Sequence, residues 1–293
     1  GIECKGDYIR IENVYVRYVK GVGLLLDGSN LVVVEKSIFM DTTLDAIKVN
    51  YCTDVVLDRV YGLGALNGNC GLRVRAGGGV FISNCHFNSN TGHGVSLEGV
   101  SSAEADTLKT VLIINTLTDN NDDVGLLIGS YVTRVHIVGL KSLYNKNGFY
   151  INTTTSTWWR IIASEFAHND NWGIFIDDGD YFVIEDVFLH DNGLGDLRND
   201  PGISYPRRVI KNVYGYTTEN SGVAVFSGDG STTTFRIEHG LVSTPSKYVV
   251  SPLTPDADAS RTITVDDTYI TITFDTAPPS GTDNVKFGWW AEV

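Results

Sequence analysis

Apolar and variable residues alternate in short runs along most of the chain, and each run follows a polar turn and a small residue. The stretch 169–180 is an example, because Gly173 is followed by Ile174, Phe175 and Ile176. Steps of 23, 25, 23, 31, 23, 25, 29 and 20 residues separate the corresponding positions Gly23, Ala46, Gly71, Gly94, Gly125, Gly148, Gly173, Gly202 and Gly222. A recurring period of this length indicates a solenoid, in which each repeat forms one turn of the structure.

Each repeat also contains a second run that is rich in β-branched and aromatic residues and has a period of two. Examples are 80–88, 135–145, 160–169 and 182–191. Such runs predict short strands, and no stretch has the sustained 3.6-residue apolar period of a helix. Two or three short strands in each repeat predict an all-β fold, a parallel β-helix whose turns pair their backbones and bury alternate side chains.

The repeat stops near residue 227, so we predict a solenoid over residues 1–226 and a second domain over residues 227–293. The second domain opens with the alternating run 228–237 and continues with the runs 247–250, 262–265, 269–274 and 285–290. Turns that contain Pro and Gly separate these runs, a pattern typical of a small antiparallel β-sandwich. Because the open end of a solenoid exposes unpaired backbone groups, we expect this domain to cap the solenoid or to form oligomers.

Some features depart from the plain repeat. The surplus residues 100–108 and 193–201 are expected to form lateral loops, which either border a binding face or are tolerated surface loops. His168 and His190 precede polar turns at positions that we take as equivalent, which favours a structural role for both. Trp158 and Trp159 are expected to serve core packing or an oligomer interface.

The composition argues against several classes of function. The net charge is −13, which disfavours binding to nucleic-acid phosphates or to anionic membrane surfaces. No apolar run is long enough to span a membrane, and the four cysteines follow no metal-ligand spacing. We therefore expect no metal, with Ca²⁺ at 119–123 or 177–180 as the alternative. The chain lacks an initiator Met, so we expect a processed product or a part of a longer chain.

The repeats over residues 7–226 resemble the right-handed β-helices of the pectin-lyase-like class, which includes phage and viral tailspikes. The segment 228–235 (GDGSTTTF), together with 239–241 and 277–281, is similar to C-terminal β-modules of viral tail-fibre proteins. The resemblance implies a homotrimer, in a virion tail or outside the cell, that binds a host surface polysaccharide and in many cases depolymerises it. Two alternatives stay open: a free-standing polysaccharide lyase, hydrolase or epimerase, and a structural adhesin without catalysis.

If Ile174 and Ile176 point inward, Phe175 and Asp177 must point to solvent, because side chains alternate along a strand. The same alternation in other repeats predicts an external stripe whose neighbouring turns lie about 4.8 Å apart. We predict that five residues of this stripe bind carbohydrate: Lys48, Arg73, Arg75, Tyr150 and Phe175. Aromatic faces stack on sugar rings, and Arg pairs with uronate carboxylates. The alternative is a solvated face with salt bridges between turns, such as Arg75 with Glu98.

Three residues are candidates for catalysis: Asp177, Glu98 and His93. Glycoside hydrolysis requires two carboxyl groups about 5–5.5 Å apart for retention, or about 6.5–9.5 Å apart for inversion. Asp177 with Glu98, or with a carboxylate of 178–180, could supply such a pair, although Asp178-Gly179-Asp180 is also typical of a turn. Elimination requires a cation at the uronate and a base such as His93 or Tyr150. The sequence leaves open whether the protein is a lyase, a hydrolase or not an enzyme.

Overall fold

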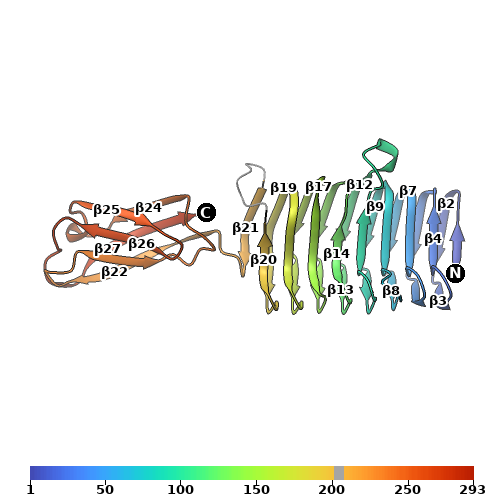
Figure 1. Ribbon diagram of the computed structural model, residues 1–293, viewed down its shortest axis with the longest axis horizontal. Helices are drawn as coiled ribbons and strands as arrows, with labels where there is room; N and C mark the ends of the chain where they lie inside the picture. Colours follow the sequence, from blue (N-terminus) through green and yellow to red (C-terminus); the bar gives the residue numbers. More distant parts are fainter. Residues whose placement is uncertain (201–207) are drawn as a thin grey trace. The chain divides into compact units, whose positions relative to one another are not determined.

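The computed structural model describes residues 1–200 and 208–293, apart from the side chains of Thr154 and Asp180, and it contains two compact units (Figure 1). The first unit spans Gly1–Gly215 and the second spans Tyr216–Val293. Gly202, one of the repeat positions counted above, lies outside the described residues. Within these described ranges, no helix is long and apolar enough to cross a membrane.

The first unit is a stack of coils, and each coil contributes strands to up to three faces. Strands of successive coils pair in parallel, as where β4 (Leu24–Asp27) pairs with the start of β7 (Ile47–Asp58). The first face consists of β1 (Ile2–Cys4), β4, β11 (Val95–Glu98), β14 (Val124–Ile128), β20 (Gly195–Asn199) and the first parts of β7, β9 (Leu72–Ser83), β17 (Asn147–Ile162) and β19 (Trp172–His190).

Two further faces complete the coils. The second face consists of β2 (Asp7–Glu12), β5 (Asn30–Glu35), β12 (Leu108–Ile114), β15 (Val132–Val138), β21 (Arg208–Tyr214) and the later parts of β7, β9, β17 and β19. The third face consists of β3 (Tyr15–Val19), β6 (Ile38–Thr42), β8 (Tyr61–Leu63), β10 (His86–Asn88), β13 (Leu117–Asp119), β16 (Lys141–Leu143), β18 (Glu165–Ala167) and the end of β19. This arrangement confirms the predicted parallel β-helix.

The interior of the coils is filled by alternate side chains from all three faces. Ile174 and Ile176 are 0% exposed, whereas Phe175 between them is half-buried and Asp177 is exposed. Large aromatic residues such as Phe149 and Phe182 are also fully buried. Burial of one such side chain contributes roughly 1.5–3 kcal/mol, so this apolar column stabilises the stack.

A ladder of asparagines, all buried except the half-buried Asn192, joins the coils at the turn between the third and the first face. Its members are Asn90, Asn121, Asn145, Asn169 and Asn192. The side-chain amide of Asn121 donates to Oδ1 of Asn145 (2.8 Å), and that of Asn145 donates to Oδ1 of Asn169 (3.2 Å). Oδ1 of Asn145 also accepts the backbone N–H of Asn121 (3.1 Å). A buried donor without a partner costs about 1–3 kcal/mol, which explains why the turns of the sequence are rich in Asn.

The two surplus stretches have different structures. Residues 100–107 of the first surplus stretch form an additional loop that contains the short 3-10 helix η1 (Glu104–Asp106), drawn in teal near β12 in Figure 1, and Leu108 begins β12. The loop expected at 193–201 is wrong for most of that stretch, because Gly195–Asn199 form strand β20. Trp172 pairs with Gly195, so this coil advances by 195 − 172 = 23 residues and is regular. The coil was not recognised in the sequence because Asp196 occupies the position at which the other repeats have Gly or Ala.

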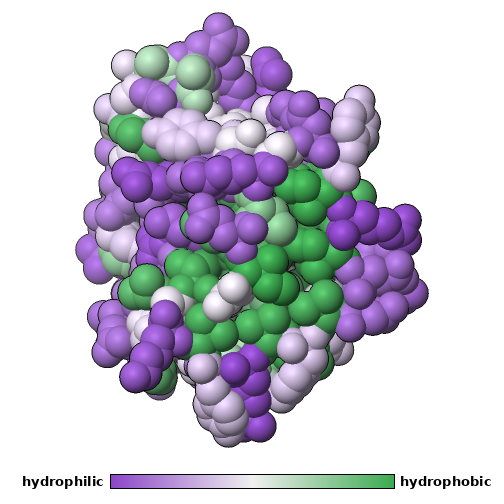
Figure 2. All heavy atoms as spheres, turned by 90° about the vertical axis from the view of Figure 1, so that its right-hand side faces the viewer, coloured by the Kyte–Doolittle hydropathy of each residue, from purple (hydrophilic) through white to green (hydrophobic). Residues whose placement is uncertain are grey.

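The first coil is covered less completely than the next. Ile9 and Val16 in its strands are half-buried, whereas Val32 and Val34 of the following coil are 0% exposed. Figure 2 looks at this end of the chain and shows hydrophobic residues gathered in the middle, with hydrophilic residues around them. The end surface of the solenoid therefore has an apolar centre and a polar rim.

The second unit contains two antiparallel three-stranded sheets. One sheet has the order β22 (Glu219–Gly228), β27 (Gly281–Glu292), β24 (Lys247–Pro252), and the other has the order β23 (Thr234–Glu238), β26 (Tyr269–Phe274), β25 (Arg261–Val265), with the 3-10 helix η2 (Pro255–Ala257) between β24 and β25. Both sheets contribute to one core, which includes Phe235, Ile272 and Phe287. This confirms the predicted antiparallel sandwich.

Residues 219–226 belong to this second unit, although the sequence assigned them to the solenoid. Gly222 pairs with Trp289 in an antiparallel register, and the division between the units falls after Gly215 rather than after residue 226. The run 221–225 resembles the repeat because an antiparallel strand has the same two-residue period as a coil strand.

Candidate functional site

The outward side chains of the first face form two rows that run from coil to coil. Strand pairing aligns the first row as Lys48, Arg73, Ser96, Leu127, Tyr150, Phe175 and Arg198. The second row contains Asn50, Arg75 and Glu98 and, further along, Asn152 and Asp178. We call the part with Asp45, Lys48, Arg73, Arg75 and Glu98 the charged half, and the part with His93, Tyr150, Trp172, Phe175 and Arg198 the aromatic half.

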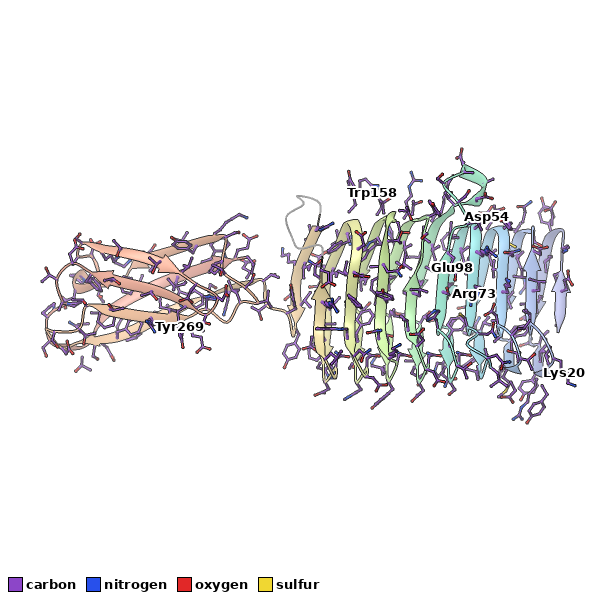
Figure 3. All side chains as sticks on the ribbon, viewed as in Figure 1. Lys20, Asp54, Arg73, Glu98, Trp158 and Tyr269 are labelled. Atoms are coloured by element: carbon purple, nitrogen blue, oxygen red, sulfur yellow. The ribbon has the colours of Figure 1, made fainter. Side chains whose placement is uncertain are left out.

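In the charged half, Arg73 is held between two carboxylates. Its Nε donates to Oδ2 of Asp45 (3.0 Å) and its Nη1 donates to Oε1 of Glu98 (2.6 Å); Figure 3 shows Arg73 and Glu98 as neighbours on the face. The Asp45 side chain is only 6% exposed, and its Oδ1 accepts the backbone N–H of Cys70 (2.9 Å). A buried carboxylate is costly without such partners, so Arg73 has a structural role. The salt bridge that was expected between Arg75 and Glu98 is made by Arg73 instead.

Two other cations of the charged half remain available to a ligand. Lys48, Arg73, Arg75 and Glu98 line a hollow of about 390 Å³ together with Asp45. Lys48 is half-buried and Arg75 is exposed. Neither cation makes an ion pair with any residue that the structure describes.

In the aromatic half, three neighbouring coils build a continuous stack. The rings of Tyr150 and Phe175 have their centroids 4.8 Å apart, and the Arg198 guanidinium lies 4.5 Å from the Phe175 centroid. Asp200 fixes this guanidinium through both carboxylate oxygens (2.7 and 2.6 Å). The Trp172 ring lies 5.9 Å from the same group. Arg198 is exposed, so the stack presents aromatic and guanidinium surfaces to solvent.

His93 and Lys146 line the hollow of about 580 Å³ next to this stack. Nδ1 of His93 accepts the backbone N–H of Val124 (3.3 Å) and lies 3.6 Å from Oδ2 of Asp123. Burial lowers the pKa of His93, and the opposing effect of the Asp123 carboxylate is smaller. A neutral imidazole that accepts a hydrogen bond at Nδ1 carries its proton on Nε2. His93 can therefore donate a hydrogen bond to a ligand.

Asp177 lies beside the aromatic half and accepts a hydrogen bond from the Tyr150 hydroxyl (3.3 Å). Burial, followed by the charge of Asp177, raises the pKa of Tyr150, so this hydroxyl is protonated at neutral pH. A register shift in β19 pairs Asn152 with Asp178 rather than with Asp177. Oδ1 of Asp178 accepts the backbone N–H of Gly179 (2.8 Å), as expected of a turn residue.

The structure does not bring Glu98 and Asp177 together. Glu98 is on β11 and Asp177 is on β19, with β14 and β17 between them. Three coil steps of about 4.8 Å separate the two carboxylates by roughly 14 Å, more than the roughly 6.5–9.5 Å that inverting hydrolysis requires. Glu98 and Asp177 therefore cannot act on one glycosidic bond as a pair.

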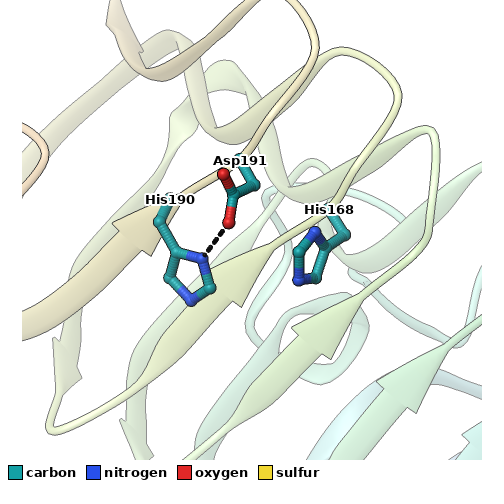
Figure 4. Close-up of side chains that lie close together, drawn as sticks. All are labelled: His168, His190 and Asp191. Carbon is teal, nitrogen blue, oxygen red and sulfur yellow. Dashed lines mark hydrogen bonds and ion pairs between the residues drawn. The ribbon is translucent and has the colours of Figure 1, made fainter.

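A possible set of metal ligands lies on the third face. His168, His190 and Asp191 place ligand atoms within 4.8 Å of one another (Figure 4). Oδ2 of Asp191 lies 2.8 Å from Nδ1 of His190, and Oε1 of Glu165 lies 3.4 Å from its Nε2. Asp191 and then Glu165 raise the pKa of His190. A metal ion at either ring nitrogen of His190 would therefore have to displace a proton that these carboxylates stabilise.

The sequence-based equivalence of His168 and His190 is wrong by one residue. His190 pairs with Ala167, so the coil position of His168 corresponds to Asp191. The His168 ring stacks on Tyr144 with centroids 5.0 Å apart.

Two residues of the site were not recognised in the sequence. Asp45 precedes Ala46, and no local pattern shows that Arg73 reaches back to it. Arg198 was assigned to a surplus loop, although it lies 198 − 175 = 23 residues after Phe175 and pairs with it. Counting one repeat onward from Phe175 could therefore have found Arg198.

Comparison with known proteins supports the same architecture. The sequence profile described as right handed beta helix region matches residues 1–149, and no curated protein matches the chain. Similar solved structures include the A-module of the mannuronan C-5 epimerase AlgE4 from Azotobacter vinelandii, with 17% identity and a TM-score of 0.61 over 71% of this chain and 60% of that chain. The periplasmic alginate epimerase AlgG has 14% identity and a TM-score of 0.56 over 66% of this chain and 47% of that chain.

A third similar structure is ORF18 of Geobacillus virus E2, with 13% identity and a TM-score of 0.54 over 93% of this chain and 59% of that chain. This chain thus spans 47–60% of the length of these three proteins. At such low identity the likeness concerns the fold.

Proposed function

The chain belongs to the right-handed β-helix family, and from that premise we propose that it binds an acidic polysaccharide along the first face of its solenoid. The observation that carries the proposal is the open stack of Tyr150, Phe175 and Arg198, which continues the same row that holds Lys48. An extended polymer laid across successive coils would contact both halves of the face.

The two halves suit different parts of such a polymer. The C–H faces of sugar rings pack on aromatic rings, so Tyr150 and Phe175 would bind the sugar rings. A uronate carboxylate can pair with both arms of a guanidinium, so Arg75 would bind carboxylates together with Lys48. His93 would donate from Nε2 to a sugar oxygen in the neighbouring hollow. Arg73 would contribute less, because Asp45 and Glu98 already neutralise it.

We further propose that the chain is the polysaccharide-binding part of a viral tail protein and acts as a homotrimer. The similarity to ORF18 of Geobacillus virus E2 supports this placement, because it extends over 93% of this chain and so reaches into the second unit. In solution, a trimer would have three times the 32.0 kDa mass of the chain. A monomer at micromolar concentration, measured by light scattering, would count against the trimer.

Elimination or epimerisation at a uronate is a second candidate function, favoured by the position of His93, Tyr150 and Arg198 around one hollow. Both reactions begin with removal of a proton next to the carboxylate, which requires a base and a cation at that carboxylate. Arg198 would supply the cation. His93 presents a donor at Nε2, however, and Tyr150 is protonated, so neither is poised as a base in the free protein. Binding without turnover is therefore the first candidate.

The experiment that tests the proposal is calorimetric titration of the whole chain with alginate oligosaccharides as the acidic probe and dextran as the neutral probe. We expect binding of alginate only, and binding at least about tenfold weaker in Phe175→Ala and in the double variant Lys48→Ala/Arg75→Ala. Matched controls on the third face are Phe188→Ala and Lys141→Ala, which should bind as the wild type does.

Unchanged affinity in both first-face variants would contradict the proposed surface. Absorbance of an unsaturated uronate product, or a change in sugar configuration detected by NMR, would show that the second candidate function is correct.

A further inference from the structure

One corner of the second face carries a column of residues with left-handed backbone conformation. Strand pairing aligns these residues in successive coils as Tyr8, Leu31, Asp54, Gly79, Thr110, Arg134, Trp158 and Tyr181, with φ between 52° and 64°. This conformation favours Gly, Asn and Asp and is unfavourable for bulky residues. Asp54 and Gly79 follow the preference, whereas the other six residues do not. The last three of the column, Arg134, Trp158 and Tyr181 in consecutive coils, combine a cation with two aromatic rings.

Trp158 and Tyr181 form an exposed aromatic platform. Their rings stack with centroids 4.9 Å apart and an angle of 28° between the planes, and Trp158 is 60% exposed. Figure 3 shows Trp158 projecting from the edge of the solenoid. The expectation of core packing holds for Trp159, which is 2% exposed, but is wrong for Trp158. Trp158 thus holds a large exposed indole at a position with φ 63°.

The platform borders a groove of about 1070 Å³ that basic residues also line. Lys109, Arg134, His136 and Arg160 all contribute to it. Lys109 pairs with Glu104 (2.9 Å), whose side chain is 92% exposed, and Arg160 pairs with Glu185 (2.8 Å). Ion pairs at such exposed positions are weak, so a ligand carboxylate can replace either acidic partner.

Arg134 is the cation best placed to meet a ligand. It is exposed and occupies the corner position one coil before Trp158, about 4.8 Å away along the stack. In the part of the chain that the structure describes, Arg134 has no ion-pair partner. An exposed guanidinium one coil from an aromatic platform can pair with a carboxylate while the adjoining ring stacks on the platform.

We propose that this groove is a second saccharide-binding site, separate from the first face, in which Trp158 stacks on a sugar ring and Arg134 binds a carboxylate of an acidic saccharide. The site is on a different face of each coil from the Tyr150–Phe175 stack, so it does not depend on the function proposed for the first face. Tyr181 supports the indole from behind, and Lys109 and Arg160 extend the basic wall.

A second copy of the chain fits this surface less well. The centres of protein–protein interfaces are depleted of charged residues, whereas cations surround the Trp158 platform. A two-fold contact through this corner would also place Arg134 and Arg160 of one copy near the same residues of the other, and like charges would repel. A three-fold contact with a different face of a neighbouring copy is distinguished by the oligomer mass of the variant in the test below. The surface composition therefore favours an acidic saccharide.

The test is calorimetric titration of the whole chain with alginate oligosaccharides, comparing the wild type with Trp158→Gly, Trp158→Phe and Arg134→Ala. Trp158→Gly is chosen because glycine adopts a φ of 63° without strain, so the coil should keep its fold. We expect two binding sites per chain in the wild type and one in Trp158→Gly and Arg134→Ala. Trp158→Phe, which keeps an aromatic face, should retain both sites with affinity within about fivefold. Long alginate chains should bind Trp158→Gly at least about tenfold more weakly.

Phe188→Ala on the third face and Arg10→Ala on an early coil are the matched controls, and both should retain two sites. Two sites in Trp158→Gly would overturn the inference, as would a reduced oligomer mass of that variant with unchanged saccharide binding, which would identify the corner as a contact between copies. If Lys48→Ala/Arg75→Ala keeps two sites, both with wild-type affinity, while Trp158→Gly loses one, the function proposed for the first face fails and the second site stands.

Discussion

The two halves of the first face use arginine in opposite ways. In the charged half, Arg73 lies between the buried carboxylate of Asp45 and the carboxylate of Glu98, and it is 22% exposed. In the aromatic half, Arg198 occupies the same row but pairs with Asp200, whose side chain is 34% exposed. The Arg198 side chain lies over the Phe175 ring and is itself 44% exposed. Burial of the acidic partner thus separates the Arg of this row that stabilises a coil from the Arg that presents its guanidinium to solvent.

The asparagine ladder underlies the same difference. It runs from Asn90 to Asn192 through the turns that lead into the strands of Tyr150 and Phe175. At its N-terminal end, Asn90 accepts a hydrogen bond from the backbone N–H of Ala65. In the coils of Lys48 and Arg73 the ladder position holds Thr42 and Ala65 instead of Asn. The turns that lead to Tyr150 and Phe175 are therefore joined by a column of amides, whereas the turn that leads to Arg73 is tied by the Asp45–Arg73 ion pair.

The largest expected effect is on the ladder. Asn145→Ala removes an acceptor for two N–H groups of Asn121 and a donor to the Thr118 carbonyl oxygen, all of them buried. Leaving such groups unpaired should lower the free energy of unfolding by about 3 kcal/mol, measured by urea denaturation. Asp170→Ala, an exposed residue in the next turn, should change it by no more than about 0.5 kcal/mol. An equally small effect of Asn145→Ala would mean that water replaces the amide.

The second expected effect is in the charged half. Arg73→Ala leaves Asp45 without its cation, and because Asp45 is buried this should cost about 2 kcal/mol of unfolding free energy. Arg75→Ala, two residues further along the strand and also facing outward, should cost less than about 0.5 kcal/mol but weaken alginate binding. If Arg73→Ala keeps full stability and loses binding instead, the contrast between the halves is wrong.

The sequence predicted the coil architecture well because its information is local. The alternation around Ile174 and the recurrence of about 23 residues follow from the pleat and from the circumference of the coil, and each can be read within one or two repeats. The site was harder to predict because its contacts cross coils. Arg73 pairs with Asp45 and Glu98, which lie 28 and 25 residues away, and strand register alone would have paired Glu98 with Arg75.

The aromatic half shows what the alternation and the repeat length can predict and what they cannot. Tyr150 and Phe175 were predicted from alternation, and they stack as neighbours. The register shift that moves Asp177 out of line with Asn152 depends on the bulge in β19, and bulges of this kind leave no period in the sequence. The catalytic roles suggested for Asp177, Glu98 and His93 stay hypotheses.

The third expected effect separates the halves by ligand. Phe175→Ala should weaken binding of alginate oligosaccharides at least about tenfold at all salt concentrations, because stacking does not depend on charge. Lys48→Ala/Arg75→Ala should weaken binding most at low salt and progressively less as salt rises, because added ions screen the wild-type cations. Calorimetry at two salt concentrations distinguishes these responses. Equal salt dependence of the two variants would show that the halves do not act separately.

The smallest expected effect concerns pH and His93, which lines the hollow beside the aromatic half. Burial lowers the pKa of folded His93 below the value of about 6.5 that the unfolded chain has. Above about pH 6.5 both states are neutral, and as the pH falls toward the folded pKa only the unfolded state takes up the proton, so stability decreases. His93→Gln should remove this acid-side loss, measured by thermal unfolding over a pH series.

His190 provides the control of opposite sign. Asp191 and Glu165 raise the pKa of folded His190, so its contribution to stability is present below about pH 6.5 and is lost as the pH rises through the folded pKa. His190→Gln should therefore be less stable than the wild type in acid and equal to it in base, by a small margin because the site is open to solvent. If His93→Gln instead behaves as His190→Gln does, the imidazole of His93 is protonated in the fold, and its role as a neutral donor in the aromatic half has to be given up.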